Sequence, residues 1–401
     1  MNFQDLGLNA RFVSRLDGLG LTTPTPIQQK AIPQALQGRD VLGIAQTGTG
    51  KTAAFGIPLV VALSKQQEKA APKSVRGLIL APTRELANQI VQTLKGLTAD
   101  LRINLVVGGK SINAQANRLS RGTDILVATP GRLIDLMERK AVDLRQTRFL
   151  VLDEADQMLD IGFVHALRRI APALGPDRQT MMFSATMPKS INTLAREYLT
   201  DAVRVEVSPP GKVADKVDHS VHFVAKEAKQ DLLIELLDKH RDDRALVFAR
   251  TKHGAERLMK HLERVGFAAT SIHGNKSQGQ RDRAISAFKA GTVRVLVATD
   301  VAARGIDIPD VGFVYNYDLP NVPENYVHRI GRTARAGRAG NAIAFCAVDE
   351  MSELKAIEKV LGTNVEIAGG EPWRGAGEKP KSRARRRPRR GSGKRKMKMA
   401  A

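Results

Sequence analysis

Short apolar runs recur along the chain in two series of five, and they constrain the fold more than any other feature. The first series comprises residues 40–45, 77–82, 124–129, 149–154 and 180–185, and the second comprises residues 245–250, 269–274, 293–300, 312–318 and 342–347. Because the runs are rich in Val, Ile and Leu and alternate with helical patterns, they predict strands buried on both faces of parallel sheets. We expect an α/β fold with two such sheets, each flanked by helices.

A segment with the composition of a linker separates the two series. Residues 208–216 read SPPGKVADK, in which two prolines and a glycine stand among polar residues. At 401 residues the chain is long enough for two domains. We therefore expect a first domain at residues 1–207 and a second at 217–370. Pro, Gly, Ser and Arg dominate residues 371–401, which predicts a tail that is disordered on its own.

This tail carries much of the positive charge. The formal net charge of the chain is +22, and residues 372–401 hold thirteen Lys or Arg against one acid, Glu378. Such a run predicts an arm that binds a polyanion, because neutralising phosphates releases counterions. A tail that only improves solubility is the alternative.

Cysteine content and hydropathy exclude several classes of protein. Cys346 is the only cysteine, so the chain has neither an intrachain disulfide nor a cysteine-rich zinc site. No apolar run reaches the roughly 18 residues that crossing a bilayer requires, and residues 1–11 lack the apolar segment of a secretory signal. These features predict a cytoplasmic location.

Residues 45–52 read AQTGTGKT and lie between a predicted strand and a predicted helix. In this context backbone N–H groups and the helix N-terminus surround phosphates, which predicts a P-loop. Gly48 and Gly50 permit the close approach, Lys51 is expected to reach the β and γ phosphates, and the Thr52 hydroxyl to bind Mg²⁺. ATP and Mg²⁺ are thus the expected cofactors. The predicted loop consists of Ala45, Gln46, Thr47, Gly48, Thr49, Gly50, Lys51 and Thr52.

The sequence DEAD at residues 153–156 follows the apolar run FLVL, so its acids are expected at the tip of a strand. Asp153 is suited to hold Mg²⁺, and Glu154 to orient the attacking water and accept its proton. An isolated pair of this kind more often caps a helix, but the upstream P-loop favours catalysis. Asp156 is expected to form hydrogen bonds with the residues Ser184 to Thr186 and to relay the state of the phosphate.

With HRIGRTAR at residues 328–335, these motifs resemble those of the DEAD-box ATP-dependent RNA helicases, most of all the short bacterial RhlE-like members. The resemblance covers about residues 2–365 and implies two tandem RecA-like domains. It also implies roles at the nucleotide for Gln28 on the adenine edge, Phe3 as its supporting aromatic, Gly305, Asp307 on the ribose, Arg332 and Arg335 as catalytic fingers, and His328 in coupling the domains. Two residues depart from the family pattern: Leu21 replaces a stacking aromatic, and Ala334 replaces a glycine.

The same resemblance implies a set of RNA-binding residues. They are small, hydroxylated or basic residues in loops at the ends of strands, which suits contacts with phosphates and sugars and not with base edges. The set comprises Pro82, Thr83, Arg84, Gly109, Thr129, Pro130, Gly131 and Arg132 in the first domain, and Arg250, Gln278, Arg281 and Thr299 in the second. We expect sequence-independent binding of single-stranded RNA and short duplexes, with RNA preferred over DNA.

The motifs together predict an RNA-dependent ATPase that separates short duplexes or remodels ribonucleoproteins, acting as a monomer. Ribosomal precursors and RNA-decay assemblies are candidate settings. An ATP-gated RNA clamp and a DNA translocase on the same fold are the alternatives. The helical pattern at residues 352–360 favours an ordinary packed terminal helix over a contact surface.

Overall fold

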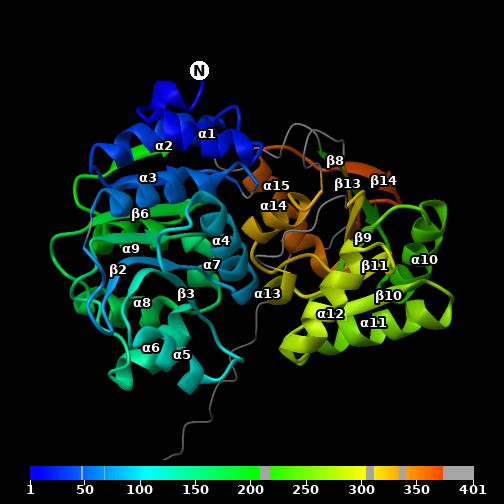
Figure 1. The fold of residues 1–401 in the computed structure, drawn as a ribbon. Coiled ribbons are helices and arrows are strands. Elements are labelled where there is room, and N and C mark those ends of the chain that lie inside the picture. The colour runs from blue at the N-terminus through cyan, green and yellow to red at the C-terminus, as the bar shows by residue number, and fades with distance from the viewer. Residues whose placement is uncertain (47, 67, 208–216, 304–310, 334–339, 374–401) are drawn as a thin grey trace, which may run out of the picture.

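The computed structural model describes residues 1–46, 48–66, 68–207, 217–303, 311–333 and 340–373. Two lobes lie side by side, the first coloured blue to green and the second green to red in Figure 1. Within these ranges, no helix combines the length and apolar character that a membrane span requires.

The first lobe is built on a parallel sheet of seven strands in the order β3-β4-β2-β5-β6-β1-β7. The strands are β1 (Val41–Ile44), β2 (Val75–Leu80), β3 (Ile103–Val106), β4 (Thr123–Ala128), β5 (Phe149–Leu152), β6 (Gln179–Ser184) and β7 (Val203–Glu206). Its helices are α1 (Ala10–Gly18), α2 (Pro26–Leu36), α3 (Lys51–Lys65), α4 (Arg84–Leu97), α5 (Ile112–Leu119), α6 (Pro130–Glu138), α7 (Ala155–Asp160), α8 (Val164–Ile170) and α9 (Lys189–Tyr198).

Two apolar clusters form the core of this lobe. In α4 the residues Leu86, Ile90, Leu94 and Leu97 recur at helical spacing and are all buried. The central strands are apolar on both faces, because helices cover each face of the sheet. Burial therefore fixes the sheet, and each strand ends at the same edge as its parallel neighbours.

The second lobe repeats this topology. Its sheet has the order β10-β11-β9-β12-β13-β8-β14, which is the order of the first sheet with every strand number raised by seven. The strands are β8 (Val217–Phe223), β9 (Ala245–Phe248), β10 (Ala269–Ile272), β11 (Val295–Ala298), β12 (Phe313–Asn316), β13 (Gly340–Cys346) and β14 (Glu366–Gly369). The helices are α10 (Lys229–Lys239), α11 (Lys252–Arg264), α12 (Gln278–Lys289), α13 (Asp300–Ala303), α14 (Glu324–Ile330) and α15 (Met351–Leu361).

The predicted fold class is confirmed, and each of the ten apolar runs overlaps a strand. The strands that the sequence pattern missed are β3, β7, β8 and β14. Three of these lie at the edges of the sheets, where one side has no strand neighbour and polar residues are tolerated. The pattern at 352–360 is the packed helix α15, which buries Leu354 and Ile357. The predicted linker 208–216 and most of the predicted tail lie outside the described residues.

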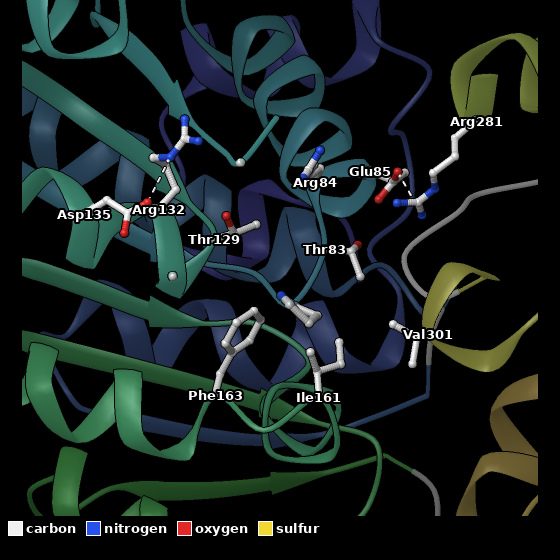
Figure 2. A pocket seen from close by; sticks show the side chains of 13 residues that line it. Thr83, Arg84, Glu85, Thr129, Arg132, Asp135, Ile161, Phe163, Arg281 and Val301 are labelled. Carbon is white, nitrogen blue, oxygen red and sulfur yellow. Dashed lines mark hydrogen bonds and ion pairs between the residues drawn. The ribbon is translucent and has the colours of Figure 1, made fainter. Parts of the chain in front are cut away.

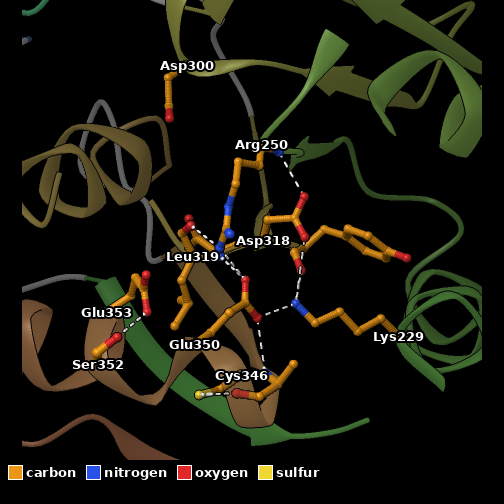
Figure 3. Close-up of polar contacts among 12 residues, drawn as sticks. Lys229, Arg250, Asp300, Asp318, Leu319, Cys346, Glu350, Ser352 and Glu353 are labelled. Carbon is orange, nitrogen blue, oxygen red and sulfur yellow. Dashed lines mark hydrogen bonds and ion pairs between the residues drawn. The ribbon is translucent and has the colours of Figure 1, made fainter. Parts of the chain in front are cut away.

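A buried ion-pair network joins β8, β9, β12 and β13 of the second lobe at their carboxyl ends (Figure 3). Glu350 accepts hydrogen bonds from Lys229 at 2.5 Å and from Arg250 at 2.7 Å. It also accepts from the backbone N–H groups of Ala347 and Leu319. The side chains of Lys229 and Glu350 are only 2% and 4% exposed. One buried carboxylate therefore satisfies the buried Lys229, the partly exposed Arg250 and two backbone amides.

We expect Glu350→Ala to destabilise the second lobe by about 3–5 kcal/mol, because it leaves a buried cation without its partner. Trp373, the only tryptophan, packs against this lobe and donates a hydrogen bond to the Cys346 carbonyl. Urea unfolding followed by its fluorescence measures the loss. The matched control is Glu235→Ala, which removes an exposed pair with Lys239 and should leave the free energy of unfolding nearly unchanged. Equal midpoints for the two variants would contradict this account.

Candidate active site and RNA-binding groove

The P-loop connects β1 to α3 at the carboxyl edge of the first sheet. Gly48 and Gly50 have φ of 87° and 91°, the left-handed region that glycine adopts without strain. A Cβ on Gly50 would stand 2.5 Å from the Gln28 side-chain nitrogen, so this position also lacks room for a side chain. Gln28 donates a hydrogen bond to the Gly50 carbonyl and accepts one from the Thr25 N–H. The residue predicted to contact adenine thus also holds the phosphate loop.

Lys51 begins α3 and is 5% exposed. Its Nζ makes no hydrogen bond to any residue that the structure describes. Buried charged groups in proteins normally have a partner, so a cation in this position is suited to an anionic ligand. The helix N-terminus behind it favours the same ligand, since N–H groups point toward it. Thr52 follows on the first turn of the same helix.

Asp153 and Glu154 follow β5, and both are 2% exposed. Burial raises the pKa of Asp153 to about 7, and the charge of Glu154 adds to the rise while Lys51 opposes it. Glu154 has φ 51° and ψ 52°, a left-handed conformation that is uncommon for a residue with a side chain. The charge of the neighbouring Glu154 thus makes ionisation of Asp153 still less favourable.

A divalent cation fits these acids, because it would compensate the negative charge that burial makes unfavourable. Mg²⁺ is usually held by one or two carboxylates and the phosphates of the substrate, with water completing the shell. Among the described residues there is no group of three or more His, Cys, Asp or Glu that could hold a metal alone. Asp153 and the Thr52 hydroxyl are the groups that would hold Mg²⁺ together with ATP.

Asp156 connects the acid motif to the loop after β6. Its Oδ2 accepts hydrogen bonds from the N–H and hydroxyl of Thr186 at 2.9 and 3.0 Å, and from the Ala185 N–H at 3.1 Å. The predicted link between Asp156 and this loop is therefore confirmed. Ser184 does not contact Asp156 but donates to the Thr186 carbonyl at 2.7 Å.

The same carboxylate meets the second lobe. His328 Nε2 lies 3.6 Å from Asp156 Oδ2. Burial alone would raise the pKa of Asp156. A hydrogen bond and the charge of His328, together with Lys51 and Thr186, lower this pKa below its usual value. Asp156 is therefore ionised at neutral pH, and its charge attracts a residue from the opposite lobe.

His328 and Arg332 lie in and after α14. Arg332 is 4% exposed, and its Nε donates to the His328 carbonyl at 3.3 Å. Thr47, Gly305, Asp307 and Arg335 are outside the described residues, so their predicted roles stay predictions. Phe3 is buried in the core of the first lobe, beside the elements that carry Gln28.

The sequence analysis overlooked Arg329, which is 2% exposed. Its guanidinium pairs with both carboxylate oxygens of Asp300, donates to Asn316 and the Asp318 carbonyl, and lies over the Phe248 ring at 4.9 Å. Arg329 thereby fixes α14 against the loop after β11. One signal was available: Arg329 follows Tyr326 by three residues, on the face of the helix that is buried.

Most predicted RNA-binding residues line one cavity of about 270 Å³ between the lobes (Figure 2). Its lining comprises Pro82, Thr83, Arg84, Glu85, Gly108, Thr129, Gly131, Arg132, Asp135, Ile161, Phe163, Arg281 and Val301. Arg281 and Val301 come from the second lobe, and the other residues come from the first. Ile161, Phe163 and Val301 were not predicted, because single apolar residues in turns or in a short helix such as α13 carry no recognisable signal in a sequence.

A polar network crosses the groove from lobe to lobe. Arg84 donates to the Gln278 side-chain oxygen at 3.1 Å, and the Gln278 amide donates to Glu85 at 3.2 Å. Glu85 also pairs with Arg281 at 3.1 Å. Gly109 has φ 74°, and a Cβ there would stand 2.1 Å from the Arg84 guanidinium, so this position requires glycine. Glu85 was missed by the sequence analysis although it directly follows the predicted residues Pro82, Thr83 and Arg84.

The structure does not bring every predicted RNA-binding residue into this groove. The Arg250 guanidinium is engaged with Glu350 and the Leu319 carbonyl. It lines a separate cavity of about 510 Å³ in the second lobe. Pro130 starts α6 beside the groove without lining it, and the Thr299 carbonyl accepts from Ala302 and Ala303 at the start of α13. Their contacts with RNA remain predictions.

Comparison with known proteins agrees with this geometry. Residues 25–194 match the DEAD/DEAH box helicase family, and residues 228–337 match the helicase conserved C-terminal domain. The ATP-dependent rRNA helicase rrp3 of Aspergillus terreus is 44% identical over 91% of this chain and 81% of its own. The DEAD-box ATP-dependent RNA helicase CshA of Bacillus cereus is 42% identical over 89% of this chain and 67% of its own. The chain spans 46% of the probable ATP-dependent RNA helicase ddx17 of Dictyostelium discoideum.

Solved structures extend the similarity to both lobes. S. cerevisiae Dbp5 bound to RNA and ADP BeF3 superposes with a TM-score of 0.81 at 32% identity, covering 92% of this chain and 95% of that one. Mss116p bound to ssRNA and AMP-PNP gives 0.82 at 30% identity, covering 92% and 79%. A DEAD box protein from Methanococcus jannaschii gives only 0.51 over 92% and 99%, although it is 37% identical. The two lobes, their motifs and these relatives together show that the chain belongs to the DEAD-box ATP-dependent RNA helicases.

Proposed function

We propose that this chain is an RNA-dependent ATPase that hydrolyses ATP between its two lobes and thereby separates short RNA duplexes or remodels ribonucleoproteins. The observation that carries the proposal is the contact of His328 with Asp156, because it joins the second lobe to the acid motif beside Lys51. A site divided between two lobes is complete only when they meet. Hydrolysis and lobe closure are then parts of one cycle.

In the proposed reaction, Lys51 and the P-loop amides neutralise the charge on the β and γ phosphates. Glu154 accepts the proton of the attacking water, and Asp153 with Thr52 holds the Mg²⁺ that supplies charge compensation to the phosphates. Arg332 and Arg335 stabilise the negative charge that develops on the transferred phosphoryl group. Gln28 is proposed to contact adenine, Asp307 to bind the ribose and Gly305 to take part in nucleotide binding.

We propose that RNA binding also favours closure of the two lobes. Arg84 and Glu85 of the first lobe contact Gln278 and Arg281 of the second across the groove. A strand of RNA held there touches both lobes and favours their closed arrangement, as ATP does. Coupling of this kind is reciprocal, so bound RNA strengthens ATP binding by the factor with which ATP strengthens RNA binding. The small, hydroxylated and basic groups contact the ribose-phosphate chain, which gives little sequence preference.

Further assignments belong to the same proposal. We propose domain boundaries at residues 207 and 217, a monomeric protein in the cytoplasm, and membership of the RhlE-like subgroup. The basic residues after Trp373 are proposed to bind structured RNA and to raise its concentration near the groove. Ribosomal precursors or RNA-decay assemblies would supply suitable duplexes.

The central test uses Glu154→Gln, which keeps the shape of the side chain and removes the base. We expect kcat for RNA-stimulated ATP hydrolysis to fall about 10²–10⁴-fold, since a positioned base contributes that much. Repeated release of a labelled short RNA strand should be lost with it. The control is Glu138→Gln, which alters an exposed residue paired with Arg169.

Two outcomes would contradict the proposed function. The parent protein would be an RNA clamp if it released the strand equally well with ATP and with a non-hydrolysable analogue and did so only once per molecule. ATPase stimulation by single-stranded DNA as strong as by RNA would indicate a DNA translocase.

His328→Ala removes the contact with Asp156 and leaves the loop at Thr186 intact. We expect the RNA concentration for half-maximal ATPase to rise at least about 5-fold, the lower end of measured coupling between sites. A titration of ATPase rate with single-stranded RNA measures this. The control is His165→Ala in α8, an exposed histidine of the first lobe. An unchanged half-saturating concentration would show that this contact does not couple the lobes.

Deletion of residues 374–401 tests the tail and keeps Trp373, which packs against the second lobe. The segment holds thirteen Lys or Arg and one acid. We expect weaker RNA binding with a smaller dependence on salt, while the kcat of ATP hydrolysis at saturating RNA is unchanged. Binding measured at several salt concentrations gives the slope. If the slope is the same with and without the tail, these residues do not bind phosphates.

A further inference from the structure

The exposed face of α11 carries a stripe of basic side chains. The stripe consists of four exposed residues: His253, Arg257, Lys260 and Arg264. They are separated by four, three and four residues along the sequence. At 3.6 residues per turn this spacing places all four on one side of the helix, over a length of roughly 17 Å. The buried residues Ala255, Leu258, Met259 and Leu262 lie on the opposite side, against the second sheet. The stripe therefore lies on the side away from the sheet, where Arg257 also lines the cavity of about 510 Å³ that Arg250 lines.

Acids neutralise several exposed cations on other helices, but they do not neutralise these. In α8, Arg168 and Arg169 pair with Glu197 and Glu138. In and after α10, Lys239 and Arg241 pair with Glu235 and Asp238. Within the described ranges of the chain, Arg257, Lys260 and Arg264 have no acidic partner.

In the described structure, neither acid of α11 forms an ion pair with a residue of the stripe. Glu256 accepts from Ser271 and contacts His273 and Lys276, and these contacts hold its pKa at about 2 against the effect of burial. The Glu256 carboxylate is thus engaged by β10 and the loop that follows it. Glu263 lies on the same flank of the helix, about 60° around the axis from Lys260 at 100° per residue, and among the described residues it pairs with neither Lys260 nor Arg264.

The stripe begins beside the groove between the lobes. Lys252, the first residue of α11, donates to the Asn275 side chain at 3.0 Å. Asn275 belongs to the loop that leads into α12, whose first turn is capped by Ser277 and carries Gln278 into the network with Arg84 and Glu85. The two basic surfaces are therefore adjacent, and α11 leads away from the groove along the outside of the second lobe (Figure 1).

We infer that the α11 stripe binds the phosphate backbone of duplex RNA while the groove holds the single strand that continues from it, an inference that rests on the proposed function. A rigid helix presents its charges in a straight row, which suits the regular backbone of a duplex more than a strand that bends. The polyanion complements the unpaired cations, and binding by backbone contacts alone needs no sequence.

The experiment compares two triple variants of the full chain that lose the same charge. Arg257→Gln, Lys260→Gln and Arg264→Gln together remove the stripe, and Arg169→Gln, Lys239→Gln and Arg241→Gln together remove paired cations of similar exposure. The probes are a blunt RNA duplex and one of its strands alone, each titrated at several salt concentrations. Trp373 fluorescence in urea checks that both variants are folded.

We expect the stripe variant to bind the duplex more weakly than the control, with a log–log salt slope reduced by roughly 2–3, since each phosphate contact contributes about 0.9 for a helical duplex. The ATPase stimulated by single-stranded RNA should match that of the control variant. Equal duplex affinities and slopes in the two variants would overturn the inference. An equal loss for the duplex and the single strand would also overturn it, in favour of a single-strand track. Failure of RNA to stimulate the parent ATPase would instead refute the proposed function.

Discussion

Burial of unbalanced charge in the nucleotide site is the constraint on which the rest of the structure depends. Lys51, Asp153 and Glu154 are each at most 5% exposed, yet Lys51 has no hydrogen-bond partner among the described residues and the pKa of Asp153 is raised to about 7. Such an arrangement is costly in a folded core and is tolerated at sites where a ligand completes it. The parallel sheet provides the scaffold, because the loops after β1, β5 and β6 all end at one edge.

The two lobes share one topology and use it differently. In the first lobe, the loops at the carboxyl edge hold buried charges that a ligand would balance. In the second lobe, the corresponding edge neutralises its own charges, with Lys229, Arg250 and Glu350 paired to one another and Arg329 paired to Asp300. The first lobe therefore resembles an incomplete site, and the second resembles a rigid support that carries His328 and Arg332 to it. The two copies of the fold thus have different tasks, which explains why the motifs of the two lobes differ so strongly.

Sequence patterns were sufficient for the sheets and for the groups that follow each strand, because burial on both faces leaves long apolar runs and the P-loop and acid motifs need fixed spacing. They were insufficient for Glu85 and Arg329, whose partners lie almost 200 and about 30 residues away and depend on the tertiary fold. Arg250 illustrates the converse. Its position in a family motif indicated RNA, but a carboxylate 100 residues away engages its guanidinium. Edge strands were missed for a related reason, since half of their hydrogen-bonding surface imposes no apolar pattern.

The Gln28 amide has two roles. It donates a hydrogen bond to the carbonyl of Gly50, a position where no side chain would fit, and it is the group expected to contact the purine. A nucleobase that displaces this amide would shift the carbonyl it holds and, with it, the turn that precedes Lys51. The protein would then discriminate among nucleoside triphosphates through the rate at which it cleaves the terminal phosphate. A wrong triphosphate would be hydrolysed more slowly even where it is bound as tightly as the right one.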